Sequence, residues 1–211
     1  KIAKNFNFEE ISNRFFKSKS ELHQIDSYFT EKSEDEIIPW RNDLGMRKEK
    51  LNNSLAIDSF YNSAKATIYD EKTKISPRAL KFFIYLTDVK SNNGSLSIIP
   101  SSNIIVKAIT KLILEKKIPL VSYWSLKDLR NVMLNLKLKD IILKEIGIEK
   151  YNNFLDQTKF VDEENLNVSK YDIEMKKGSV IIFDELCIHR GSAPKFNPRI
   201  VLRYFYRKKI I

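Results

Sequence analysis

Cysteine and histidine are almost absent from this sequence. Its 211 residues include one cysteine, Cys187, and two histidines, His23 and His189. A single cysteine cannot form a disulfide within the chain, which fits a reducing compartment such as the cytoplasm. So few cysteines and histidines also provide no cluster for a structural zinc ion. We therefore expect a cytoplasmic protein whose fold depends on a buried apolar core.

Long apolar runs and glycines are scarce as well. The longest apolar runs, such as Phe82–Leu86, are far too short to cross a bilayer, and no N-terminal stretch has the apolar core of a signal peptide. We therefore expect no membrane span. Of the five glycines, Gly178 and Gly191 stand alone, so no glycine-rich loop for binding phosphate is present.

Positive charge is abundant. The net charge is +10 and the isoelectric point is about 9.5. The lysines are scattered through every segment, and no basic stripe interleaved with aromatic residues stands out, so a nucleic-acid partner is not expected. A basic surface does raise the local concentration of anions, which leaves an anionic small-molecule substrate open.

The sequence predicts strands on both sides of a central helical block. Residues 80–89 are the clearest strand because they are rich in β-branched and aromatic side chains, and the Ser-Asn-Asn-Gly turn at 91–94 follows them. Three further strands are predicted at 95–99, 179–183 and 200–206. Apolar residues at three- and four-residue spacing predict helices over 104–117 and 125–158. Residues 1–35 also read as helical, 31–53 as loop, and 60–69 as the start of the sheet.

This order of elements does not make alternating strand–helix–strand units. It argues against a parallel sheet and favours an antiparallel jelly roll with helical additions. We expect one domain over residues 1–211. Its N-terminal region of helices and loops would cover residues 1–60, and a helical insert would occupy residues 104–170 between the two halves of the jelly roll.

Two segments carry a resemblance to a known family. Residues 79–103, ALKFFIYLTDVKSNNGSLSIIPSSN, combine a strand ending in Leu-Thr-Asp with an Asn-Gly turn and a second strand. Residues 176–206, KKGSVIIFDELCIHRGSAPKFNPRIVLRYFY, combine a glycine turn, a strand, a histidine and an arginine one strand further on. Both resemble signatures of the phytanoyl-CoA dioxygenase-like proteins. The resemblance implies a double-stranded β-helix, the cupin-like form of the jelly roll.

The resemblance also implies a non-haem Fe(II) site that uses 2-oxoglutarate. Such a site needs two imidazoles and one carboxylate on one face of the metal. By position, His189 would be one metal ligand and Asp70 the carboxylate, but Ile68 stands where the other histidine belongs. Arg199 would anchor 2-oxoglutarate, because its planar guanidinium matches a carboxylate. On the strand at 80–89, Tyr85 and Lys81 share a face that can add to the 2-oxoglutarate pocket.

Three functions remain open at this point. The first is an Fe(II)- and 2-oxoglutarate-dependent dioxygenase with an incomplete triad that hydroxylates a small molecule. The second is a non-catalytic member that has lost iron and serves as a binding or regulatory module. The third and weakest is an anion or nucleic-acid binder that acts through its basic surface, which predicts steeply salt-dependent affinity.

Overall fold

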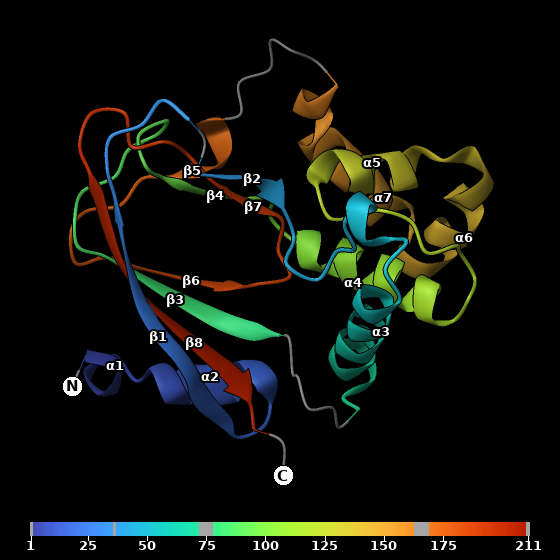
Figure 1. The fold of residues 1–211 in the computed structure, drawn as a ribbon, viewed down its shortest axis with the longest axis horizontal. Helices are drawn as coiled ribbons and strands as arrows, with labels where there is room; N and C mark the ends of the chain where they lie inside the picture. Colours follow the sequence, from blue (N-terminus) through green and yellow to red (C-terminus); the bar gives the residue numbers. More distant parts are fainter. Residues whose placement is uncertain (1, 36, 72–77, 163–168, 210–211) are drawn as a thin grey trace.

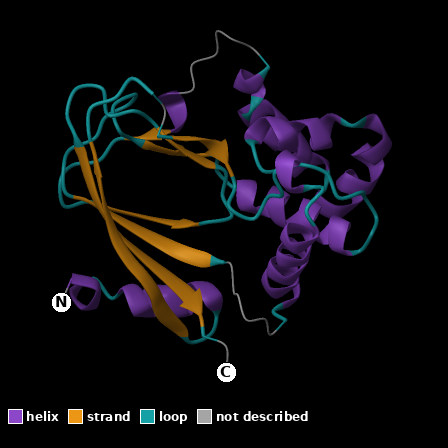
Figure 2. Ribbon diagram, viewed as in Figure 1, coloured by secondary structure: helices purple, strands orange, loops and turns teal. Residues whose placement is uncertain are grey.

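Two four-stranded antiparallel sheets lie at one side of the molecule and a group of helices at the other (Figures 1 and 2). The computed structural model describes residues 2–35, 37–71, 78–162 and 169–209. The larger sheet has the order β1 (Ser20–Thr30), β8 (Arg199–Lys208), β3 (Ala79–Tyr85) and β6 (Val180–Asp184). The smaller sheet has the order β2 (Ile38–Arg41), β7 (His189–Gly191), β4 (Leu96–Ile98) and β5 (Asp172–Ile173).

The helices fall into two groups (Figure 1). The short N-terminal pair packs beside the larger sheet and consists of α1 (Ile2–Asn5) and α2 (Phe8–Phe16). The second group lies beyond the ends of the strands and consists of α3 (Ser54–Tyr69), α4 (Ser102–Leu114), α5 (Leu126–Leu134), α6 (Leu136–Ile146) and α7 (Ile148–Gln157). Short 3₁₀ turns occur at Lys48–Lys50, Lys159–Val161 and Ser169–Tyr171. None of the helices in the described part of the chain combines the length and apolarity that a membrane crossing requires.

Strand β3 has two different faces, because successive side chains alternate across a sheet. Leu80, Phe82 and Ile84 pack with Phe8 of α2, whose ring centroid lies 4.3 Å from that of Phe82. The opposite face carries Tyr85, which packs against residues of both sheets, including Leu96 of β4 and Val201 of β8. The opposite face therefore points toward the smaller sheet. Lys81 belongs to this face by its position in the alternation.

Most of the predicted elements are confirmed. The strands expected at 80–89, 95–99, 179–183 and 200–206 correspond to β3, β4, β6 and β8, and the helix expected at 104–117 corresponds to α4. The helix expected at 125–158 is three helices, with breaks at Asn135 and Gly147. Asn92 and Gly94 have positive φ values, as the predicted turn requires.

Three local predictions are wrong. Residues 20–30 are strand β1 instead of helix, and they pair with β8 along almost the whole strand. Residues 60–69 belong to helix α3 instead of a strand. This helix begins where the Asn53 side chain accepts a hydrogen bond from the Ala56 amide at 3.0 Å, and it buries Phe60 and Ala64 on one face. Strand β2 lies within the stretch predicted as loop.

Candidate functional site

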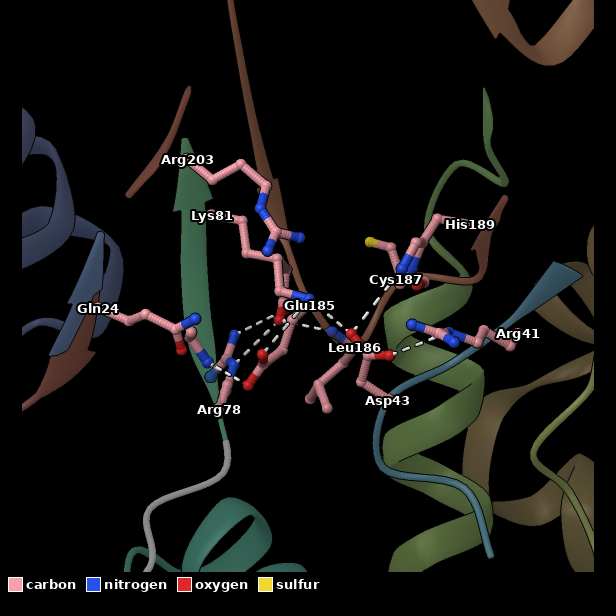
Figure 3. A network of polar contacts seen from close by, with 12 residues as sticks. Gln24, Arg41, Asp43, Arg78, Lys81, Glu185, Leu186, Cys187, His189 and Arg203 are labelled. Atoms are coloured by element: carbon pink, nitrogen blue, oxygen red, sulfur yellow. Dashed lines mark hydrogen bonds and ion pairs between the residues drawn. The ribbon is translucent and has the colours of Figure 1, made fainter. Parts of the chain in front are cut away.

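Four ionisable side chains from distant parts of the chain converge where the two sheets approach each other (Figure 3). Asp43 follows β2 by two residues, and Lys81 lies on β3. Glu185 follows the last residue of β6, and His189 begins β7. The pairing of β3 with β6 places Lys81 opposite Phe183, two residues before Glu185. Both sheets thus contribute to one cluster, which we call the Lys81 cluster.

The Lys81 ammonium is the centre of this cluster. Its Nζ atom lies 2.6 Å from Oδ2 of Asp43 and 3.7 Å from Oε2 of Glu185. Nε2 of His189 lies 3.8 Å from the same Asp43 oxygen, and Nε of Arg41 lies 3.4 Å from Oδ1. The Asp43 carboxylate therefore has a cation close to each of its two oxygens.

The environment shifts the protonation of the cluster in different directions. Burial raises the pKa of Glu185 to about 7, while burial lowers the pKa of His189 below its usual range. Burial would raise the pKa of Asp43 too, but the charge of Lys81 and the neighbouring cations outweigh it, so the pKa of Asp43 is lowered. At neutral pH, Asp43 is therefore ionised and His189 is an uncharged imidazole. The Nδ1 atom of His189 lies 2.8 Å from the carbonyl oxygen of Cys187, which holds the ring in place.

The structure does not bring Asp70 and His189 together. Asp70 is the C-cap of α3, and its carboxylate is 69% exposed and accepts a hydrogen bond from Lys208 Nζ at 2.7 Å. Ile68 lies in the last turn of α3 and borders a surface pocket together with Asp70 and Lys107. His189 is buried in the smaller sheet, beside Asp43. The expected pairing rested on a strand at 60–69 that is in fact a helix.

Asp43 is the site residue that the sequence reasoning missed. Asp43 stands two residues after Arg41, the last residue of β2. The only feature of the sequence that could have pointed to Asp43 was a carboxylate just after a short strand. Because residues 31–53 were predicted as loop, that strand was not recognised. Asn42 fixes this segment, because its side-chain amide donates to the backbone carbonyls of Tyr123 and Trp124 at 2.8 and 3.1 Å.

Arg199 and Tyr85, which the resemblance places at a 2-oxoglutarate pocket, lie close to each other. Both are buried, and the charge of Arg199 acts on the Tyr85 hydroxyl, although burial dominates and raises the pKa of Tyr85 to about 12. Nη1 of Arg199 donates to the carbonyl oxygen of Gly94 at 3.0 Å. Within the described part of the chain, Arg199 Nε and the Tyr85 hydroxyl are both buried without a hydrogen-bond partner of standard geometry, and the hydroxyl has only a weaker contact with the backbone of Leu96. Buried polar atoms without partners are costly to the folded state.

The residues beside His189 do not fit an Fe(II) ion. Asp43 Oδ2 and His189 Nε2 lie 3.8 Å apart, and the ammonium of Lys81 lies 2.6 Å from the same Asp43 oxygen, where a metal ion would have to lie. Arg41, whose Nε lies 3.4 Å from Oδ1 of Asp43, has no lone pair to donate. Within the described residues, no group of three His, Cys, Asp or Glu side chains could hold a metal. The ammonium of Lys81 supplies a positive charge to Asp43 instead.

No protein-family model matches the chain, and no curated protein sequence matches it. Among solved structures it is similar to EvdMO1, with 13% identity and a TM-score of 0.46 over 96% of this chain and 31% of that one. It is also similar to AviO1 from Streptomyces viridochromogenes Tue57, with 11% identity and a TM-score of 0.40 over 93% and 56% of the two chains. For iron-bound HygX from Streptomyces hygroscopicus, the identity is 12% and the TM-score 0.43, over 98% and 68%. The chain thus spans about a third of EvdMO1 and just over half of AviO1.

Proposed function

We propose that this chain is a double-stranded β-helix domain of the 2-oxoglutarate oxygenase type that binds a small carboxylate ligand without iron. In this proposal it is a non-catalytic binding module, one domain over residues 1–211, similar to the phytanoyl-CoA dioxygenase-like proteins. The two antiparallel sheets and the resemblance of residues 79–103 and 176–206 to that family support the fold.

The contact between Lys81 and Asp43 carries the proposal. A metal held by Asp43 and His189 would have to lie about 2 Å from the carboxylate oxygen, but an ammonium already lies 2.6 Å from that oxygen. Lys81 is only 8% exposed, so its side chain has little freedom to leave for solvent. Moving it away would leave Asp43 without its closest cation and Lys81 without its closest anion, which is costly for partly buried charges. The ammonium of Lys81 therefore provides the positive charge beside Asp43 that a metal ion would otherwise provide.

Arg199 and Tyr85 support the retention of a ligand. Nε of Arg199 has no partner of standard geometry within the described residues, a property it shares with the Nε atoms of Arg41, Arg130 and Arg207. Beside Arg199, however, lies a second buried polar group without such a partner, the Tyr85 hydroxyl, close enough for the charge of Arg199 to act on it. A carboxylate could accept a hydrogen bond from each of them. 2-Oxoglutarate, which carries two carboxylates, is the ligand that the family resemblance suggests, and it would be bound here rather than oxidised.

One observation favours a second candidate, the dioxygenase with an incomplete triad. Asp43 and His189 approach to 3.8 Å, and a small movement of either side chain would bring both donors to a shared metal. In that case Lys81 would have to turn away, and water would complete the coordination. Iron and 2-oxoglutarate would then supply oxidising chemistry toward a small-molecule substrate.

Calorimetric titration separates the two candidates. The purified chain would be titrated with Mn(II), a stand-in for Fe(II) that resists oxidation, and separately with 2-oxoglutarate in the absence of metal. We expect no stoichiometric Mn(II) binding and measurable 2-oxoglutarate binding that Arg199→Ala weakens at least tenfold. Arg14→Ala is the matched control, because the Arg14 side chain is 79% exposed on α2. Stoichiometric Mn(II) binding, together with release of succinate when Fe(II) is supplied, would favour the dioxygenase.

A further inference from the structure

A second pocket opens beside the Lys81 cluster, between the loop that follows β2 and helix α3. Its volume is about 420 Å³, and its polar lining includes Arg41, Arg47, Lys50, Ser59, Ser63 and the indole of Trp124. Asp43 also borders it, so the pocket and the Lys81 cluster share one residue. Arg199 and Tyr85 are not part of its lining.

The wall of this pocket is built by close backbone contacts. The backbone amide of Tyr123 donates to the carbonyl of Met46 at 3.2 Å, and the amide of Asn42 donates to the carbonyl of Trp124 at 3.0 Å. Gly45 lies where these two segments meet, and a Cβ atom there would lie 2.5 Å from Cα of Trp124. The pocket therefore exists before any ligand arrives, which lowers the cost of binding.

The charges that line the pocket are unbalanced. Asp43 is its one acidic lining residue among those described, and Lys81 already neutralises that carboxylate. Arg47 has Glu49 at 3.8 Å, and the two side chains are 41% and 67% exposed, so solvent screens this pair and it contributes little. Lys50 forms no ion pair with any other residue in the described ranges. Arg41, Arg47 and Lys50 thus leave an excess of positive charge facing the pocket.

The arrangement of the donors suits a phosphate group. The guanidinium carbon of Arg47 lies 4.1 Å from the centre of the Trp124 ring, and a stacked guanidinium keeps its N–H groups at the edge for a bidentate contact. Ser59 and Ser63 follow each other by one helical turn on α3, so their hydroxyls share a face. Two arginines, a lysine and two hydroxyls can surround a tetrahedral dianion. The volume leaves room for an organic group attached to it.

We propose that this pocket binds the phosphate of a small organic phosphate ester. The proposal stands apart from the carboxylate site, since neither Arg199 nor Tyr85 takes part in it. Arg47 and Lys50 provide the positive charge that attracts the negatively charged phosphate. Arg41 connects the pocket with the Lys81 cluster, because it borders the pocket while its Nε lies 3.4 Å from Oδ1 of Asp43.

The test uses inorganic phosphate and phenyl phosphate as probes, titrated calorimetrically into the full chain at physiological salt. We expect phenyl phosphate to bind more tightly than inorganic phosphate, and Arg47→Gln and Lys50→Gln each to weaken both probes at least fivefold. Lys177→Gln removes the same charge from an exposed turn and should change the affinity less than twofold. Circular dichroism would verify that each variant is folded.

Three results would overturn the proposal. Equal weakening by Arg47→Gln and Lys177→Gln would mean that the probes respond only to the overall charge. Loss of phosphate binding in Arg199→Ala, with Arg47→Gln unaffected, would place the anion at the carboxylate site. If phenyl phosphate bound no more tightly than inorganic phosphate, the pocket would not recognise the organic group, and the assignment of an organic phosphate ester would be wrong. Failure of 2-oxoglutarate to bind would count against the proposed function alone.

Discussion

The Nζ atom of Lys81 lies 2.6 Å from the Oδ2 atom of Asp43, although the two residues are 38 positions apart in the sequence. The contact joins strand β3 of the larger sheet to the loop after β2 of the smaller sheet (Figure 3). Glu185 and His189 complete the surroundings of this pair. The electrostatic balance of the cluster therefore depends on one ammonium group.

Replacement of Lys81 by methionine should destabilise the protein. The change preserves the apolar stem but leaves Asp43 without its closest cation, and removal of one partner from a buried ion pair costs about 3 kcal/mol or more. Because the Asp43 side chain is 25% exposed, we expect a loss of about 2 kcal/mol, since solvent screens part of the charge. Urea denaturation would measure it. Lys139→Met, an exposed site on α6, is the control and should change stability by less than about 0.5 kcal/mol.

Glu185 should make stability depend on pH. Burial raises its pKa from the ordinary 4.5 to about 7, so the folded state holds this proton more tightly than the unfolded state does. The contribution is fully present below the unfolded pKa and is lost as the pH rises through about 7. Glu185→Gln removes this loss, so the stability of the variant relative to the native chain should rise by roughly 2–3 kcal/mol between about pH 5 and pH 8.

The lowered pKa of His189 acts in the opposite direction, because its contribution is lost as the pH falls below the usual 6.5. The neutral imidazole is present in both proteins, so its effect largely cancels when the two are compared. Denaturant titrations of both proteins across this range would measure the difference. A difference that does not change with pH would mean that Glu185 is ionised normally in the folded state.

The sequence predicted the central strands because local rules decide them. The β-branched and aromatic run at Ala79–Tyr85 and the turn with positive φ at Asn92 and Gly94 both lie within one short segment. Strand β1 was missed for the same local reason. Its apolar residues Leu22, Ile25 and Phe29 recur at helical spacing, yet pairing with β8 outweighs that pattern.

The site could be predicted only in part. His189, Arg199 and Tyr85 were singled out from segments that resemble a family, and Lys81 from the alternation of one strand. Asp43 could not be found in this way, because helix α3 separates it from β3 and the count back along the chain ended at Asp70 instead. Contacts across such a separation depend on how the two sheets pack, which no local pattern encodes.

Gly45→Ala should destabilise the chain and disturb the phosphate pocket. The added Cβ would lie 2.5 Å from Cα of Trp124 and 2.7 Å from the carbonyl oxygen of Tyr123, and both are backbone atoms that cannot rotate away. Overpacking of this kind costs about 1–3 kcal/mol. Gly147→Ala is the comparison, because its Cβ would meet no atom within 4 Å, while its backbone (φ 82°, ψ 156°) has a conformation that is almost restricted to glycine. Its cost of about 1–3 kcal/mol therefore comes from the backbone alone. Gly45→Ala should lower both the thermal unfolding temperature and the affinity for phenyl phosphate. Gly147→Ala should lower only the unfolding temperature.

The last prediction concerns the creation of a metal site. Arg41 stands two residues before Asp43 with its Nε 3.4 Å from Oδ1 of that residue, and Lys81 supplies the cation nearest to Asp43. The double variant Arg41→His with Lys81→Met provides a second imidazole and removes the competing ammonium. The new imidazole would then join Asp43 and His189 to present two imidazoles and a carboxylate, the donor set that Fe(II) prefers.

We expect this double variant to gain stoichiometric Mn(II) binding, at least a hundredfold tighter than any binding by the native chain. Each single variant should bind Mn(II) much more weakly than the double variant. Lys81→Met alone lacks the second imidazole, and Arg41→His alone keeps the ammonium of Lys81 beside Asp43. Ile68→His is the matched control, since it adds a histidine at the position that the sequence alone suggested, on helix α3 beside Asp70. Calorimetry with Mn(II) would compare all of these variants with the native chain. If Ile68→His gained the metal and the double variant did not, the metal position would belong to α3, and the role assigned to Asp43 would fail.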